Sequence, residues 1–448
     1  MKKLILSIAL LSTCTLIACD KTDKGEKETE QNDTNTLLNN DITSNLTLKS
    51  GKTYTLENII YVKNGATLTI EPGVTIKAKK GKNAIVITRG AKIMAEGTAD
   101  KPIVFTSASD TPEAGDWGGI VILGKATTNT VYNGQQGVGE IEGGVNNAEG
   151  LGLYGGNDDD DNSGILKYAR IEYAGYPFQP NSELNSLTMA GVGRGTTISY
   201  VQCLYGYDDA FEWFGGTVNC DHLIAYKTLD DDFDTDLGYR GRVQFALAIR
   251  DKNIADISGA NGFESDNDAN GTTASPVTAP IFANITIIGP LETSNTTIDA
   301  NFKRAAHLRR NTQTSIYNSI LMGYPTGIYL DGQLAATNLG SGAMELQGNI
   351  IAGMNKGIDS TNIDAAGINY AQIISNGNNQ IIATNAAVNL INPFSSTDFN
   401  PTPSSASPAS TGAVYSTKLT NSGVQRVNYR GAINPTGDTW WKGWTKFN

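Results

Sequence analysis

Short runs in which apolar and polar residues alternate recur along most of the chain, and Gly, Pro or Asn separates each run from the next. Two examples are TLTIEPGVTIKA at 67–78 and AIVITRGAKIMAEG at 84–97. Alternation of this kind, with Val, Ile and Thr prominent, predicts short β-strands, whereas an amphipathic helix would place apolar residues every third or fourth position. The pattern therefore predicts an all-β protein.

The strand-like runs also repeat with a period. TISYVQCLYGYDDAFEWFGG at 197–216 aligns with NCDHLIAYKTLDDDFDTDLG at 219–238, so that Phe211 falls on Phe233 and Glu212 on Asp234. A period of about 20–30 residues built from short β-type runs is typical of a solenoid. Each period of roughly 22–25 residues is therefore expected to form one coil of a β-helix. Phe211 and Phe233 should stack inside it, and Glu212 and Asp234 should stay outside that stack.

The same register stacks acidic residues from successive coils about 4.8 Å apart, which is the spacing of paired strands. Carboxylates at that spacing repel one another unless cations or basic side chains neutralise them. A second acidic segment, ESDNDANG at 264–271, has the oxygen spacing that opens a calcium loop, without the later Glu of an EF-hand. The candidate metal ligands, with calcium as the candidate cofactor, are Asp208, Asp209, Glu212, Asp230, Asp231, Asp232, Asp234, Asp236, Asp266, Asp268 and Asn270.

Two other interpretations of these acids remain open. Acidic turns rich in Asp, Asn and Gly also form for backbone reasons, as NDDDDNSG at 157–164 would. The stacked acids of successive coils, here called the acidic strip, could also be neutralised by arginines instead of calcium, because salt bridges would relieve the same repulsion. Those that follow the strip along the chain are Arg240, Arg242, Arg304, Arg309 and Arg310.

The first 45 residues predict export and anchoring. Residues 1–18 combine two lysines with the apolar run LILSIALLSTCTLIA, which is typical of a secretory signal. LIAC at 16–19 resembles the lipobox of bacterial lipoproteins, which implies cleavage before Cys19 and lipid on its thiol. Residues 19–45 are polar and are expected to form a disordered tether. The β-helix is expected at 46–398.

The last segment, 399–448, is expected to be a loop followed by a cap over the open end of the solenoid, because an uncovered last coil would expose strand edges and core. Its aromatic residues are Trp440, Trp441, Trp444 and Phe447. Insertions between coils are expected on one face, at 130–164, 252–279, 290–303 and 333–343.

Net charge narrows the classes of binding partner, and the positions of the cysteines indicate their state. The formal charge is −11, and it becomes −13 without residues 1–18, so nucleic acid and anionic membrane surfaces are disfavoured. Cys203 and Cys220 stack on Ala225 and Ile198 rather than on each other in the 22-residue register. They are therefore predicted to be buried and unpaired.

Several segments carry a family resemblance. NGATLTIEPGVTIKA (64–78) and EGTADKPIVFTS (96–107) resemble the first coils of pectate-lyase-like right-handed parallel β-helix proteins. GDWGGIVILGKA (115–126), DDAFEWFGGTVN (208–219) and YRGAINPTGDTWWKGWTKF (429–447) are similar to outer-membrane lipoproteins of the Bacteroidota with that fold. The resemblance implies fold and location, and fold alone implies no activity.

Two functions follow as hypotheses. The first is a non-enzymatic surface lipoprotein that presents an acidic, aromatic wall to a polysaccharide or to an outer-membrane protein such as a TonB-dependent transporter. The second is an anchored, calcium-dependent polysaccharide lyase, or a glycoside hydrolase with Asp208 and Asp231 as paired carboxylates. No catalytic motif of either enzyme matches residue by residue. The candidate ligand-binding residues are Tyr205, Tyr207, Trp213, Arg240 and Arg242.

Overall fold

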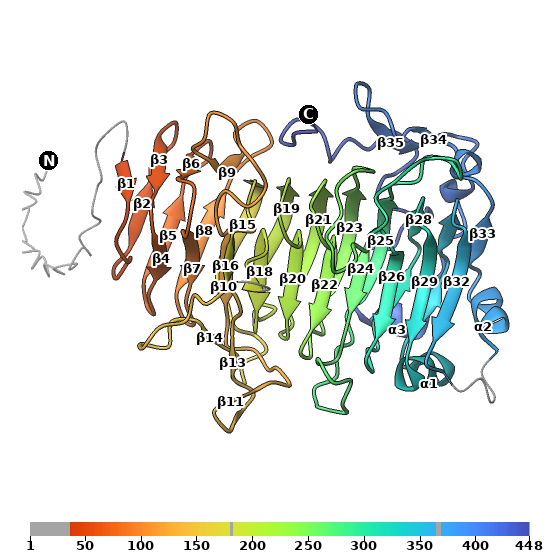
Figure 1. Cartoon of the computed structure of the whole chain (residues 1–448), viewed down its shortest axis with the longest axis horizontal. Coiled ribbons are helices and arrows are strands. Elements are labelled where there is room, and N and C mark those ends of the chain that lie inside the picture. Colours follow the sequence, from red (N-terminus) through yellow and green to blue (C-terminus); the bar gives the residue numbers. More distant parts are fainter. Residues whose placement is uncertain (1–35, 180–181, 364–368, 448) are drawn as a thin grey trace, which may run out of the picture.

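The computed structural model describes residues 36–447 apart from 180–181 and 364–368. They form a right-handed parallel β-helix with its long axis horizontal in Figure 1. The prediction of an all-β solenoid is confirmed, because the long ladders are parallel and the helices are short. None of the helices in the described part of the chain is long and apolar enough to cross a membrane.

One wall is a ten-stranded parallel sheet, here called the second sheet. Its strands follow one another along the axis as β4 (Ile59–Val62), β7 (Ala84–Ile87), β10 (Ile120–Leu123), β18 (Leu187–Ala190), β20 (Phe211–Phe214), β22 (Phe233–Asp236), β24 (Phe263–Ser265), β26 (Arg304–Arg309), β29 (Thr326–Asp331) and β32 (Lys356–Thr361).

The other walls belong to a seventeen-stranded sheet, the large sheet. In the first coils each turn contributes two short strands: β1 (Thr36–Leu38), β2 (Leu46–Leu48), β3 (Thr53–Leu56), β5 (Thr67–Ile70), β6 (Thr75–Ala78), β8 (Lys92–Glu96) and β9 (Ile103–Ser107). In the middle coils the two merge into β15 (Gly164–Glu172), β19 (Thr197–Leu204), β21 (Asn219–Tyr226), β23 (Arg242–Ile249) and β25 (Ile281–Ile288). They separate again as β27 (Ser315–Tyr317), β28 (Ile320–Met322), β30 (Leu346–Gln347), β31 (Ile350–Ala352) and β33 (Gln380–Ile382).

Each merged strand bends at one residue with a positive φ angle. Those residues include Tyr168, Tyr200 and His222. Their rings stack on the outside of the wall, with centroids 4.4 Å apart for the tyrosine pair and 4.2 Å apart for Tyr200 and His222. Left-handed backbone is unfavourable for such residues. The stacked rings and the paired strands on both sides of each bend therefore hold a conformation that the local sequence does not favour.

The predicted register is confirmed. Phe211 pairs with Phe233 and Glu212 with Asp234 in neighbouring strands of the second sheet. The two phenylalanines are fully buried and stacked, with ring centroids 5.9 Å apart. Cys203 and Cys220 are buried and free, and they pair with Ala225 and Ile198 as expected. The alternation of a strand thus places the aromatic side chains inside and the carboxylates outside.

The remaining elements lie outside the coils or connect them. Hairpins are formed by β11 (Val131–Tyr132) with β12 (Gln135–Gln136), β13 (Gly139–Glu140) with β14 (Leu153–Tyr154), β16 (Pro177–Gln179) with β17 (Ser182–Glu183) and β34 (Leu390–Asn392) with β35 (Asn400–Pro403). The helices are α1 (Gln333–Ser341), α2 (Tyr370–Asn376), α3 (Thr417–Asn421) and the short 3-10 turns η1 (Asn385–Val388) and η2 (Pro408–Ser410). The hairpins at 131–154 and α1 project from one side, as expected for insertions (Figure 1).

Two predicted boundaries need correction. The tether was expected to reach residue 45, but β1 pairs with β3, and Leu38 and Ile42 are buried in the core. The coil therefore begins earlier, because these apolar residues cover the first turn. At the other boundary, the β34–β35 hairpin crosses position 398 and the last strand paired to the large sheet ends at Ile382. Residues 1–35, including Cys19, lie outside the described part.

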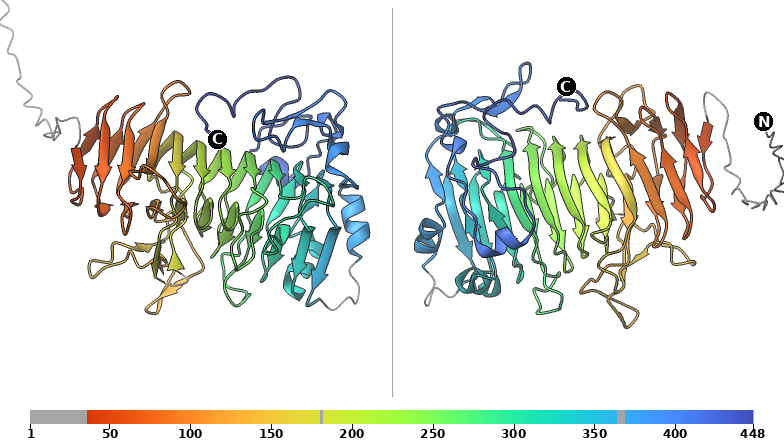
Figure 2. Two further views of the ribbon diagram at one scale, coloured as in Figure 1. Left: turned by 45° about the horizontal axis from the view of Figure 1, so that its top comes forward. Right: turned by 180° about the vertical axis from the view of Figure 1, so that it is seen from behind.

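The expected position of the aromatic tail is also corrected, because the tail does not cap the open end of the solenoid. Trp444 packs edge-on against Tyr168 and Tyr200, and the Tyr226 hydroxyl donates a 2.5 Å hydrogen bond to the Phe447 carbonyl. The last described residues, up to Phe447, accordingly lie near the middle of the long axis (Figures 1 and 2). The outer faces of β19, β21 and β23 carry apolar residues such as Leu204 and Ile224, and the tail buries them.

Candidate functional site

A single outward-facing column of residues on the second sheet contains the predicted acidic strip. Early in the column Tyr61, Val86 and Val121 are apolar and pack under inserted residues such as Ile141 and Val145. Farther along the axis the same column becomes acidic and then polar, in the order Thr188, Glu212, Asp234, Glu264, His307 and Tyr329. The change in side-chain character follows the inserted segment, because Ile141 and Val145 pack over the apolar part, whereas Glu142 reaches Asn185 beside Glu212.

A second set of acids lies at the corner that leads into the strands of this sheet. Asp208 and Asp209 precede β20, and Asp230 and Asp231 precede β22. Asp209 Oδ1 accepts a 2.8 Å hydrogen bond from the Asp231 amide, and Asp231 Oδ1 accepts one from the amide of Asn261. Each buried carboxylate therefore holds the backbone of the next coil, which fixes its own position.

The corner and the column bring the acids close enough to share cations. In three overlapping groups, one ligand oxygen from each member lies within 4.8 Å of the others. Calcium takes carboxylate and amide oxygens at about 2.3–2.6 Å, so oxygens on opposite sides of one ion can be about 5 Å apart. The groups are Asp208 with Asp209 and Asp230, Asp209 with Glu212 and Asp234, and Asp231 with Asp234 and Glu264. We call their members the carboxylate cluster.

The arginines named from the sequence neutralise only one end of this wall. Arg309 binds Glu264, and its Nε lies 2.7 Å from Asp266 Oδ1. Arg310 Nη1 lies 2.8 Å from Asp266 Oδ2. His307 completes this end through Nδ1, which lies 3.3 Å from Glu264 Oε2. The salt-bridge hypothesis therefore holds for Glu264 and Asp266, whereas the members of the carboxylate cluster other than Glu264 have no basic partner among the described residues.

The other arginines point elsewhere. Arg240 Nη2 lies 3.0 Å from Asp159 Oδ2, in the acidic loop at 157–164. Arg242 donates to the Ser422 carbonyl, and Arg304 stacks over the Tyr329 ring. Within the described ranges, no ion pair with Lys, Arg or His is formed by the carboxylates of Asp208, Asp209, Glu212, Asp230, Asp231, Asp234 and Asp236.

The electrostatics of the cluster follow from this shortage of cations. Burial, strengthened by the neighbouring charges, raises the pKa of Asp209, Glu212 and Asp234 well above the usual range. Burial raises the pKa of Asp230 to about 6 and that of Asp236 to about 7. Glu264 differs: although burial opposes its ionisation, His307 and Arg309 lower its pKa. The carboxylates that form no ion pair therefore favour a bound proton or a bound cation at neutral pH.

The remaining predicted site residues lie apart from the cluster. Asp232 is fully buried and pairs with Arg250, their side-chain atoms 3.0 Å apart. Asp268 accepts hydrogen bonds from the amides of Asn270 and Thr272, so its oxygens close their own turn. Asp266 is held by Arg309 and Arg310. The structure therefore gives the 264–271 loop internal partners for its carboxylates.

The predicted aromatic residues divide between the core and the surface. Trp213 is fully buried between Phe211 and Tyr239, so its prediction as a ligand-binding residue was wrong. It alternates with Glu212 along β20 and must point inward when Glu212 points outward. Tyr205 stacks on Tyr173 in a ladder between coils. Tyr207 is 39% exposed beside Asp208 and is the aromatic residue of the set that faces solvent.

Sequence reasoning missed two polar residues of the site. Asn185 donates one hydrogen bond to Glu212 and another, of 3.3 Å, to Glu142. Asn261 Nδ2 donates hydrogen bonds to Asp231 Oδ2 and Glu264 Oε2, at 3.4 and 3.2 Å, and Asn261 Oδ1 is buried with no hydrogen-bond partner among the described residues. Asn261 lies 30 residues after Asp231 because residues 252–260 enlarge its coil, so the 22-residue register did not reveal it.

Comparison with known proteins bears on the fold. The model of the family described as "Pectate-lyase like beta helix domain" matches residues 40–445. Among solved structures, the crystal structure of pectate lyase Pel9A is similar with a TM-score of 0.42 and 12% sequence identity, over 83% of this chain and 88% of that one. No curated protein shows significant similarity to this sequence.

Proposed function

The chain belongs to the family of pectate-lyase-like β-helix domains, and from its site we propose that it is a calcium-binding, non-enzymatic lipoprotein of the outer cell surface. Its lipid anchor would be Cys19, in the segment that precedes the described residues. The carboxylate cluster would hold calcium, and the wall around it would bind an acidic polysaccharide or an outer-membrane transporter.

The observation that carries this proposal is a concentration of carboxylates of which, among the described residues, only Glu264 has basic partners, Arg309 and His307. The carboxylate oxygens meet in three groups within 4.8 Å. Asn261, whose Nδ2 donates to Asp231 and Glu264, also has a buried Oδ1 without a hydrogen-bond partner among the described residues. Hard oxygen donors that carry several negative charges suit calcium better than they suit softer metals. A bound cation would offset both the burial and the mutual repulsion that raise the pKa values of these groups.

The positions of the basic side chains favour binding over cleavage. A pectate-lyase-type reaction would use calcium to bind and acidify a uronate, and an unpaired Arg or Lys to remove a proton. Near the cluster, Arg250 is fully buried against Asp232, and Arg309 is held by Glu264 and Asp266. An arginine held between two carboxylates is a poor proton acceptor. A calcium-bridged contact with the carboxylates of a polysaccharide needs no such base.

Calcium binding is tested by thermal unfolding with added calcium and with chelator. A ligand that binds only the folded state adds about 2.7 kcal/mol at a concentration 100 times its dissociation constant. The double variant Asp209→Asn/Asp234→Asn should lose the calcium-dependent rise in melting temperature. Asp160→Asn is the matched control, because Asp160 is an exposed acid in the separate loop at 157–164. If only the double variant Asp266→Asn/Asp268→Asn loses the calcium-dependent rise in melting temperature, the calcium site is the 264–271 loop instead.

A melting temperature of the wild type that does not change with calcium would contradict the proposal.

The family membership favours a calcium-dependent polysaccharide lyase as the second candidate. That candidate is tested by incubating the calcium-loaded protein with polygalacturonate and following unsaturated products. Product formation that Asp209→Asn abolishes would replace the non-enzymatic proposal, whereas calcium-dependent retention on the polymer without product would support it.

A further inference from the structure

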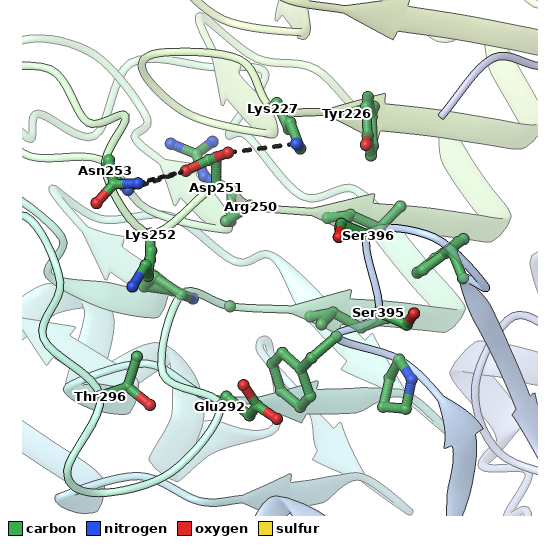
Figure 3. Close-up of a pocket in the computed structure, with 17 residues that line it drawn as sticks. Tyr226, Lys227, Arg250, Asp251, Lys252, Asn253, Glu292, Thr296, Ser395 and Ser396 are labelled. Carbon is green, nitrogen blue, oxygen red and sulfur yellow. Dashed lines mark hydrogen bonds and ion pairs between the residues drawn. The ribbon is translucent and has the colours of Figure 1, made fainter. Parts of the chain in front are cut away.

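A pocket of about 300 Å³, lined by none of the carboxylate cluster's residues, lies at the ends of β21, β23 and β25. Its opposite wall comes from residues 393–399, in the loop of the β34–β35 hairpin. Figure 3 shows these two sides, with Lys252 and Asn253 on one and Ser395 and Ser396 on the other. A volume near the lower bound of about 300–1,000 Å³ for ligand sites suits a small molecule.

One part of the pocket lining is apolar. Ile249 and Ile288 end their strands with almost no exposure, at 6% and 1%. Phe394 and Phe399 come from the hairpin loop and pack against the cluster of apolar residues under the tail. Phe399 is fixed by Trp441 and Phe447, with ring centroids 5.7 and 4.9 Å away. The aromatic wall is therefore held in place by the same tail that covers β19–β23.

The polar part is also held in place. Asp251 Oδ1 accepts a 3.1 Å hydrogen bond from the Asn253 amide, and Asp251 Oδ2 lies 3.2 Å from Lys227 Nζ. Across the pocket mouth, the Thr293 amide donates a 2.9 Å hydrogen bond to Thr296 Oγ1. These contacts fix the two loops before any ligand arrives, which lowers the entropy cost of binding.

The basic residues of the lining are matched by acidic ones when the buried Asp232 behind Arg250 is counted. Lys227 is paired with Asp251, and Arg250 turns its guanidinium to the buried Asp232. Lys252 and Glu292 are exposed and of opposite sign. Ion pairs with exposed charges contribute about 0–1 kcal/mol, so neither an anion nor a zwitterion gains much here. Affinity must come from the apolar wall and from neutral hydrogen bonds.

From this combination we propose that the pocket binds a neutral saccharide of one or two rings. The carbon-bonded face of a sugar ring packs on aromatic side chains, and hydroxyls both donate and accept hydrogen bonds. The pocket offers acceptors on Asp251 and Glu292 and donors on Lys252 and Asn253. This proposal does not rest on calcium at the carboxylate cluster, which belongs to different side chains.

The test uses the whole chain in chelator with neutral disaccharides (maltose, cellobiose and lactose), digalacturonate and glycine as probes, followed by saturation-transfer NMR and calorimetry. We expect at least one neutral disaccharide to bind. Phe394→Ala should weaken it by about tenfold, the equivalent of one lost aromatic contact. Glu292→Ala, a change at an exposed side chain that leaves the fold intact, should weaken it severalfold. Tyr132→Ala, in the distant β11–β12 hairpin, is the matched control and should bind as the wild type does.

The melting temperature of each variant shows whether it folds. The proposal is overturned if no neutral disaccharide binds at millimolar concentration, if only digalacturonate or glycine binds, or if both Phe394→Ala and Glu292→Ala bind as the wild type does. Because chelator is present throughout, these outcomes do not depend on whether the carboxylate cluster holds calcium.

Discussion

At the scale of single residues, the cluster shows how position in a strand determines chemistry. Glu212 and Trp213 are adjacent, yet one belongs to the acidic wall and the other to the core. Burial of an unpaired carboxylate is costly, and proteins usually avoid it unless a proton or a cation compensates. Asp209 and Asp231 are both buried and form no ion pair in the described part of the chain.

The pH dependence of stability follows from these shifts. The pKa of Asp230 rises from 3.8 to about 6 on folding and that of Asp236 from 3.8 to about 7. A raised pKa contributes stability that is present below pH 3.8 and is lost as the pH rises through the folded-state value. In chelator the melting temperature should therefore fall between about pH 5 and about pH 8.

Calcium should remove most of that fall, because the cation replaces the protons at neutral pH. Scanning fluorimetry across this range, with and without calcium, measures both curves. Groups whose pKa is lowered on folding, such as Glu264, titrate below this window and do not obscure it. A melting temperature in chelator that rises toward neutral pH would show that ionisation of these carboxylates does not destabilise the folded protein.

At the scale of elements, the interior is organised as stacks along the axis. The rings of Phe211, Phe233 and Phe263 follow one another in β20, β22 and β24, with centroids 5.9 and 5.4 Å apart. Because each coil contacts chiefly its neighbours, stability is distributed through such stacks. The central member of a stack has a neighbour on both sides, so its loss disturbs two interfaces.

Replacement of the central ring should be strongly destabilising. Phe233→Ala should lower the free energy of unfolding by about 3–5 kcal/mol, the usual loss for a buried aromatic. Urea unfolding followed by fluorescence measures the change. Tyr207→Ala removes an exposed aromatic nearby and should change the free energy by less than about 0.5 kcal/mol. Equal effects of the two substitutions would contradict the stacked interior.

The tail provides a second prediction for an element. Trp444→Ala removes a fully buried side chain that covers Tyr168 and Tyr200. Amide exchange should increase in residues 440–447 and in β19 and β21, since the tail covers those strands. Exchange in β31 and β33 should stay unchanged. Faster exchange confined to those last strands would instead show that the tail acts as an end cap.

At the scale of the whole molecule, the solenoid places its inserted hairpins and its C-terminal tail on different surfaces. Inserted hairpins project from one side, and the C-terminal tail runs along the opposite side (Figure 1). The lipid proposed for Cys19 would hold this elongated molecule (Figure 1) by the end at which its first coil forms. Without residues 1–18 the formal charge is −13, which would keep the anchored protein from lying on an anionic membrane.

Anchoring is tested by one substitution. Cys19→Ser removes the thiol that would carry the lipid, so the protein should leave the membrane fraction and appear in the soluble fraction. Fractionation with immunoblotting measures the distribution, and Cys14→Ser, within the apolar run of the signal, is the control that should stay membrane-bound. Unchanged membrane association of Cys19→Ser would contradict the lipoprotein proposal.

The sequence by itself determined what repeats. Because each coil advances one strand spacing and side chains alternate, a 22-residue offset was enough to place Phe211 on Phe233, Glu212 on Asp234 and both free cysteines in the core. The acidic character of the wall follows from the same periodicity. These are local properties, and they depend only on residues in adjacent coils.

The tertiary structure decided what does not repeat. Arg309 reaches Glu264, whereas Arg240 reaches back to Asp159, and no periodicity relates these pairs. The inserted segment that brings Glu142 near Asn185 and the tail that turns back over β19 are likewise outside the register. Which carboxylates keep a basic partner depends on where such segments pack, and packing between distant segments is set by the folded surface rather than by the repeat.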